Sequence, residues 1–165
     1  MKNLLAIVLV LFSLGLFSLG QARAEDAAGA VSSYRKQHGL PGVSTDPALT
    51  QLARQQAAAM ARSGSLSHSV GGSFASRVAG RSTAAENIAM GTSNLSATLA
   101  MWKRSSGHNS NLLRRGVTRI GVASATSSNG RMYWALIVAG PVEKRPALTL
   151  PGRRRVAGPR PIGEW

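Results

Sequence analysis

The clearest hydrophobic pattern in the chain lies in residues 46–64, where apolar side chains recur at steps of three and four. Asp46 can cap a helix that starts here, Pro47 suits its first position, and Gly64 follows the last periodic residue. The apolar positions that share one face are Leu49, Leu52, Ala53, Ala57, Met60 and Ala61. The segment therefore predicts an amphipathic helix with one buried face.

Three further helical segments are predicted by weaker signals. The first begins near Asp26, which can act as its cap, and ends at His38, with Gly39 as a left-handed stop. His38 then lies at a helix C-terminus, where a cation is favoured, so we read it as structural. A helix over residues 95–105 and a helical turn over residues 109–113 follow later in the chain.

Between these helices, residues 64–91 are rich in Gly and Ser and show no sustained period. They predict a long structured loop, with at most a short helix over residues 74–78. Long loops of this kind in a compact domain are usually functional or disordered. This stretch is therefore where we expect functional side chains.

After Gly116 the period changes to two, over residues 117–124. Asn129-Gly130 gives the signal of a type I′ hairpin turn, and residues 131–139 predict the returning strand. Trp102, Tyr133 and Trp134 are expected in the core rather than as a ligand platform. Helices followed by a hairpin predict an α+β fold in which helices cover a small antiparallel sheet.

The two ends of the chain differ from its middle. Residues 1–24 combine a short basic start, an apolar run from Leu4 to Leu19 and the small-x-small site Ala22-Arg23-Ala24, which is typical of a cleaved secretory signal. The run is shorter than the roughly 20 residues that a spanning helix needs, so we expect no transmembrane span in the mature protein. We therefore expect export to the periplasm or the extracellular space, one domain over residues 25–145, and a flexible basic tail over residues 146–165.

The composition of the chain limits which covalent links can stabilise it and which partners it can attract. The chain has no Cys, which excludes disulfides and a cysteine-linked lipid anchor. Its formal net charge is +14, so it should be attracted to anionic cell-envelope components or lipids. Nucleic acid is not expected as the main partner, because the few aromatic residues (Trp 3, Tyr 2, Phe 3) are not interleaved with a basic stripe.

The candidate chemistry centres on one carboxylate. Between Ala27 and Val142 the only acidic residues are Asp46 and Glu86, and Glu86 lies midway between His68 and His108. Two imidazoles and a carboxylate can ligate zinc or another divalent metal, and they can also exchange protons near neutral pH. The alternative is structural: Glu86 bonds to the backbone of the loop while the histidines belong to a buried polar network.

A serine hydrolase is a second enzymatic alternative. It would pair Ser67, Ser105 or Ser106 with a histidine that Glu86 orients. The nearest approach to a nucleophile elbow, residues 71–75, departs from the Gly-x-Ser-x-Gly pattern and follows no predicted strand. The sequence therefore offers the residue types of such a site without its local motif.

Several short segments, in their order along the chain, resemble a known family. They are Tyr34-Arg35…His38-Gly39-Leu40-Pro41, Met60-Ala61…Gly64…Leu66-Ser67-His68, Ala85-Glu86-Asn87-Ile88-Ala89, Trp102…Ser105-Ser106-Gly107-His108…Asn111-Leu112-Leu113, Ile120-Gly121-Val122 and Tyr133-Trp134. Together they resemble a bacterial CAP (SCP-like extracellular) domain. The CAP superfamily contains the cysteine-rich secretory proteins, antigen five and the plant pathogenesis-related class one proteins.

The resemblance implies a three-layer α-β-α sandwich, an exported protein, and a cleft lined by two histidines and one or two acidic residues. His68, Glu86 and His108 match three of those positions. Ser105 stands where many eukaryotic members carry a second acidic residue, and Asn87 and Asn111 are expected to line the same cleft. Binding of sterols or fatty acids in some members adds a lipid to the possible ligands.

The leading hypothesis is an exported, non-catalytic binding protein whose cleft takes a divalent metal or a small ligand, with a lipid as one option. The first alternative is a hydrolase acting on an envelope peptide, glycan or ester, with Glu86 as general base or water-positioning group and the histidines holding metal or protons. A structural interaction module without a cleft ligand is the third hypothesis.

Overall fold

The computed structural model describes residues 27–143; the predicted signal peptide and the predicted basic tail lie outside this range. Residues 27–37 are helical, and we call this segment helix 27–37. The elements that follow it are β1 (Ser44–Thr45), α2 (Pro47–Ser63), α3 (Phe74–Arg77), β2 (Ala84–Met90), α4 (Leu95–Arg104), α5 (Ser106–Leu112), β3 (Arg119–Thr126) and β4 (Met132–Ala139). The helices predicted over 46–64, 74–78, 95–105 and 109–113 are thereby confirmed.

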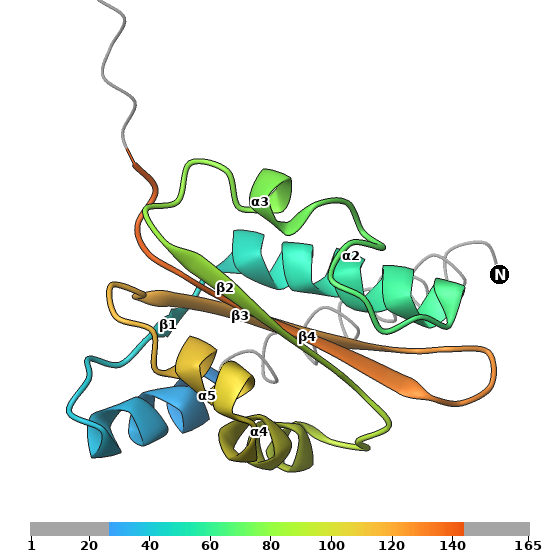
Figure 1. Cartoon of the computed structure of the whole chain (residues 1–165), viewed down its shortest axis with the longest axis horizontal. Helices are drawn as coiled ribbons and strands as arrows, with labels where there is room; N and C mark the ends of the chain where they lie inside the picture. Colours follow the sequence, from blue (N-terminus) through green and yellow to red (C-terminus); the bar gives the residue numbers. More distant parts are fainter. Residues whose placement is uncertain (1–26, 144–165) are drawn as a thin grey trace, which may run out of the picture.

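One four-stranded sheet, in the order β1-β3-β4-β2, forms the middle layer. Strands β3, β4 and β2 are antiparallel neighbours, whereas β1 pairs in parallel with β3. Figure 1 shows α2 and α3 on one face of the sheet and helix 27–37, α4 and α5 on the other. The α+β sandwich is therefore confirmed, and the sheet is antiparallel except at the short edge strand β1.

Strand β4 joins the two halves of the core because both of its faces are covered. Trp134, Leu136 and Val138 pack toward α4 and α5, while the alternate residues of the strand pack toward α2. Every residue from Tyr133 to Ala139 is buried. A strand covered on both faces reads as a continuous apolar run. The predicted core positions of Trp102, Tyr133 and Trp134 are confirmed, since each is at most 4% exposed.

Local signals set the ends of α2. The Asp46 carboxylate accepts hydrogen bonds from the amides of Ala48 (2.8 Å) and Leu49 (3.2 Å), and Gly64 adopts the left-handed conformation at φ 66°. Both features are those that the sequence predicted. Gly39 closes helix 27–37 in the same way, at φ 68°.

The prediction of a long structured loop over residues 64–91 is wrong at its end. Residues 84–90 form β2, which pairs along its whole length with β4, from Ala84 opposite Ala139 to Met90 opposite Tyr133. The segment shows no alternation because five consecutive residues, Ala85–Ala89, are all buried, the polar Glu86 and Asn87 among them. A strand buried on both faces is not visible to a period-two search.

The hairpin between β3 and β4 is confirmed, but its predicted turn type is wrong. A type I′ turn needs positive φ at both central residues, whereas among the described residues only glycines have positive φ. The amide of Gly130 donates to the carbonyl of Ser127, and the Ser127 amide donates to the Arg131 carbonyl. With Gly130 at φ 78°, this is a three-residue loop that ends in a left-handed glycine.

Candidate functional site

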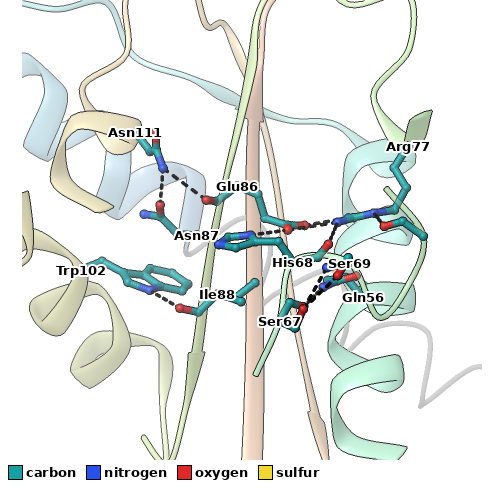
Figure 2. Close-up of polar contacts among 11 residues, drawn as sticks. Gln56, Ser67, His68, Ser69, Arg77, Glu86, Asn87, Ile88, Trp102 and Asn111 are labelled. Atoms are coloured by element: carbon teal, nitrogen blue, oxygen red, sulfur yellow. Dashed lines mark hydrogen bonds and ion pairs between the residues drawn. The ribbon is translucent and has the colours of Figure 1, made fainter. Parts of the chain in front are cut away.

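The site is built around β2, the strand at one edge of the sheet. Successive side chains of a strand point to opposite faces, so Glu86 and Asn87 leave β2 in opposite directions. Glu86 extends toward the loop that carries His68 and toward α3, while Asn87 extends toward α5 (Figure 2). Residues from both outer layers of the sandwich therefore meet at this edge.

Glu86 forms a two-point ion pair with Arg77, the last residue of α3. Nη1 of Arg77 lies 2.7 Å from Oε2 of Glu86, and Nη2 lies 3.0 Å from Oε1. The two side chains are only 7% and 1% exposed. A paired guanidinium and carboxylate in this forked geometry form one of the stronger polar contacts in proteins, and the guanidinium compensates a buried negative charge.

His68 is oriented by the same carboxylate. Its Nδ1 atom lies 2.8 Å from Oε1 of Glu86, and its backbone carbonyl accepts from Nη2 of Arg77 at 2.9 Å. An ionised carboxylate only accepts, so Nδ1 carries the hydrogen and Nε2 of the neutral ring keeps its lone pair. The His68 side chain as a whole is 56% exposed.

The loop that carries His68 is tied to α2 by Gln56. Nε2 of Gln56 donates to the backbone carbonyl of Ser67 at 2.7 Å, and the Gln56 side chain is fully buried. The hydroxyls of Ser67 and Ser69 lie 3.1 Å apart on the surface of this loop. The position of His68 is thus set by contacts on both of its sides, from α2 and from α3.

His108 reaches the site from α5, on the other face of the sheet. Its Nδ1 lies 2.9 Å from the hydroxyl of Ser105, and its backbone carbonyl accepts from Nδ2 of Asn87 at 3.0 Å. Burial lowers the pKa of His108, and the charge of His68 lowers it further. Because His68 contributes to this shift, the two imidazoles lie within electrostatic range of each other.

Side chains also cap the outer edge of β2. Asn111 donates to the Glu86 carbonyl at 3.2 Å and to Oδ1 of Asn87 at 2.9 Å, and Trp102 donates through Nε1 to the Ile88 carbonyl at 3.2 Å. Unpaired carbonyls at a sheet edge would otherwise be open to another strand. Asn87 and Asn111 therefore fasten α5, and with it His108, to the edge strand.

The three residues predicted to form a metal site are arranged in two groups. His68 and Glu86 are in direct contact, whereas His108 is paired with Ser105. Within residues 27–143 no group of three or more His, Asp or Glu side chains is placed to hold a metal ion. The metal ligand set therefore stays a prediction, and the structure adds Arg77 as the main partner of Glu86.

Arg77 is the site residue that the sequence did not single out. The chain contains 20 Lys and Arg residues, and Arg77 lies in the Gly- and Ser-rich stretch without a motif of its own. The one available signal was indirect: a carboxylate among apolar neighbours, such as Glu86 in Ala85-Glu86-Asn87-Ile88-Ala89, needs a counter-ion if it is buried. That argument requires a cation nearby but does not identify it.

The residues of a serine triad are present, but they are distributed over two histidines. Ser105 contacts His108, whereas Glu86 contacts His68. In a triad, one imidazole lies between the nucleophile and the carboxylate. Ser67 bonds to Ser69 rather than to a histidine, and Ser106 is the first residue of α5. The described residues at this site therefore do not form a Ser-His-Glu triad.

Comparison with known proteins gives one family and several related folds. A family model described as CAP, cysteine-rich secretory protein family, matches residues 28–138. An outer surface protein of Borrelia burgdorferi is similar in structure, with a TM-score of 0.63 and 17% identity over 68% of this chain and 88% of that one. No curated protein matches the sequence.

Two other solved structures share the fold. An extracellular protein of Bacillus anthracis that contains an SCP domain has a TM-score of 0.64 and 24% identity, over 73% of this chain and 41% of that one. A cysteine-rich secretory protein of Staphylococcus aureus has a TM-score of 0.56 and 18% identity, over 73% and 39%. The chain thus spans about two fifths of the length of these two proteins.

The described residues also bear on membrane insertion. Over residues 27–143, none of the helices has the length and the apolar character that a bilayer crossing requires.

Proposed function

This chain belongs to the CAP, or cysteine-rich secretory protein, family, and on that premise we propose that it is an exported, non-catalytic binding module. Its ligand is a divalent metal or a small molecule such as a lipid, held by His68 and His108. The observation that carries the proposal is the contact of 2.8 Å between Nδ1 of His68 and Glu86, on a side chain that is 56% exposed; this contact leaves Nε2 of the neutral ring as a lone-pair donor.

The donor set fits a metal held by imidazole nitrogens. A metal-binding histidine usually donates its other ring nitrogen to a carboxylate, which fixes the tautomer and raises its basicity. The contact between His68 and Glu86 has this form. His108 would supply the second nitrogen, and its lowered pKa keeps the ring neutral near pH 7, as a metal ligand must be.

Calorimetric titration of zinc into the mature protein, beside His68→Ala and His108→Ala, tests the metal part of the proposal. We expect measurable heat for the unmodified protein and a loss of most of it in both variants. Equal heats in all three proteins would remove the metal from the proposal. His38→Ala, which alters a histidine at the end of helix 27–37, is the matched control and should leave the heat unchanged.

A hydrolase is the second candidate function, because Ser105 lies in hydrogen-bond contact with His108. Glu86 is a poor general base in this arrangement, since both of its oxygens accept from Arg77 and its side chain is 1% exposed. His108, whose Nδ1 contacts the Ser105 hydroxyl, would take that role instead. Activity profiling with peptide, glycan and ester substrates, repeated on Ser105→Ala, separates an enzyme from a binding module.

The basic surface supports an anionic partner in the cell envelope. Within the described part of the chain, Asp46 and Glu86 are both in ion pairs with arginines, Arg81 and Arg77. Exposed cations that take part in no described ion pair include Lys36, Arg54, Arg62, Arg104, Arg114, Arg115, Arg119 and Arg131. The positive charge is therefore carried at the surface, where anionic lipids or polymers would meet it.

The basic tail predicted over residues 146–165 should add to this attraction. Removing it is expected to weaken retention on vesicles that contain an anionic lipid at low salt, and to leave the thermal unfolding of the domain unchanged. Unchanged retention would count against a role of the tail in partner binding.

A further inference from the structure

The Glu86 carboxylate accepts hydrogen bonds from Arg77, the site residue that the sequence did not single out, and from His68. Oε1 accepts from Arg77 Nη2 at 3.0 Å and from His68 Nδ1 at 2.8 Å, and Oε2 accepts from Arg77 Nη1 at 2.7 Å. With 1% of its side chain exposed, the carboxylate has little open surface on which a solvent cation could bind. Its negative charge is already balanced by a guanidinium.

Arg77 is itself held firmly in this position. Beyond Glu86, its Nη2 donates to the His68 carbonyl at 2.9 Å and its Nε to the Gly72 carbonyl at 3.4 Å. Its guanidinium lies over the ring of Phe74, 5.4 Å from the ring centroid. The α3 turn that presents Arg77 is capped by the hydroxyl of Ser73. These contacts fix the guanidinium of Arg77 between α3 and the loop that carries His68.

Building on the proposed function, we propose that Arg77 determines which cations the site of His68 and His108 accepts, because it reserves Glu86 for His68 and keeps the carboxylate from coordinating a metal. A cation that binds at this site then meets imidazole nitrogens. Such donors suit zinc, copper and nickel, whereas magnesium, calcium and manganese prefer carboxylate oxygens. The site is therefore expected to bind the first group of metals in preference to the second.

The role proposed for Arg77 is clearest when the site is compared with the ligand set that the sequence predicted. His68, His108 and Glu86 together would form a site of two imidazoles and one carboxylate, a donor set that also suits manganese and ferrous iron. In this structure the Glu86 carboxylate contacts His68 directly, so it would affect a metal only by orienting the His68 ring. Loss of the guanidinium would free both Glu86 oxygens from their main partner.

Calorimetric titration with manganese and with zinc tests the inference. The proteins compared are the mature protein, Arg77→Met and the double variant Arg77→Met/Glu86→Gln. We expect the unmodified protein to bind zinc and not manganese. Arg77→Met should bind manganese and should tighten zinc binding on the order of tenfold, and the double variant should lose both gains. The matched control is Arg81→Met, which breaks the similar 2.7 Å ion pair with Asp46, and it should leave both titrations unchanged.

A measurement on the unmodified protein covers the case in which Arg77→Met does not fold. On saturation with zinc, the ring nitrogen signals of His68 and His108 should shift in NMR spectra, while the Arg77 guanidinium signals stay in place. Displacement of the Arg77 signals, or manganese binding by the unmodified protein that Glu86→Gln abolishes, would overturn the inference.

The two proposals can fail separately. If the unmodified protein binds neither metal but Arg77→Met binds manganese, the inference stands and the metal part of the proposed function fails. If zinc binds through the histidines and a folded Arg77→Met gains nothing for either metal, the proposed function stands and the inference fails.

Discussion

Gly121 of β3 lies directly against the backbone of Leu49 in the first turn of α2. A Cβ atom at position 121 would overlap the Leu49 carbonyl carbon and the Thr50 nitrogen, which are backbone atoms that cannot rotate away. The helix that forms one outer layer of the sandwich therefore approaches the sheet at a distance that only glycine allows.

Gly121→Ala should destabilise the domain by about 3 kcal/mol, because overpacked cores cost free energy when backbone must move. Urea unfolding followed by circular dichroism measures the change. Gly107→Ala is the control: the space around that Cβ is open and its φ is not positive, so a small gain of about 0.5 kcal/mol is expected. Equal stabilities of the two variants would contradict the close approach.

Arg35 is expected to be the most sensitive charged residue of the core. It is 1% exposed and donates to the backbone carbonyls of Pro41 (2.8 Å), Leu112 (2.8 Å), Arg114 (2.9 Å) and Val117 (3.4 Å). Arg35→Met leaves these carbonyls without their donor, and the free energy of unfolding should fall by at least about 3 kcal/mol. Arg54→Met, at an exposed position of α2, should change it by less than about 0.5 kcal/mol.

His108 should make the domain less stable in mild acid. Burial, and then the charge of His68, lower its pKa in the folded state below the usual 6.5. Between the folded and the unfolded pKa the unfolded chain binds more protons, so stability falls as the pH drops below about 6.5. The urea midpoint of the unmodified protein should decrease from pH 7.5 to pH 5.5 more than that of His108→Asn.

A second measurement separates the two causes of that shift. In NMR titrations, His68→Asn should raise the pKa of His108 only part of the way toward 6.5, because burial is the larger cause. A complete return to 6.5 would mean that charge repulsion, rather than burial, controls the titration of His108.

Asp46 should stabilise the fold above its pKa. Partial burial acts to raise the pKa of this carboxyl, but the hydrogen bond and charge of Arg81, together with the amides of Leu49 and Ala48, outweigh it and lower the pKa below 3.8. Stability from such a group is present above the unfolded pKa and is lost as the pH falls through the folded value. Asp46→Asn should therefore cost about 1 kcal/mol at pH 6.

That difference should disappear as both proteins are taken to acid. As the pH falls through the lowered pKa of the folded state, the carboxyl of the unmodified protein becomes protonated and gives no charge to Arg81. Thermal unfolding of the two proteins at several pH values checks this. A constant difference down to pH 2.5 would show that the amide disturbs the cap rather than the ion pair.

The sequence by itself was sufficient for the helices and for the family resemblance. Asp46, Pro47 and Gly64 marked the ends of α2 because capping and stop signals act over one helical turn, within reach of their own neighbours in the chain. The hairpin of β3 and β4 was visible for the same reason, although its turn type was not. The motif segments also contain His68, Glu86 and His108, whose role as ligands stays a prediction.

Tertiary structure decided how those residues are used. Strand β2 is defined by its pairing with β4, and the role of Glu86 is defined by its ion pair with Arg77 on α3. Both contacts join distant segments, which no local sequence pattern specifies. The energy of a buried carboxylate depends on the cation that folding places beside it, here Arg77. Local sequence therefore predicted the elements and the chemical groups, while the partner of each group followed from the packing of distant segments at one sheet edge.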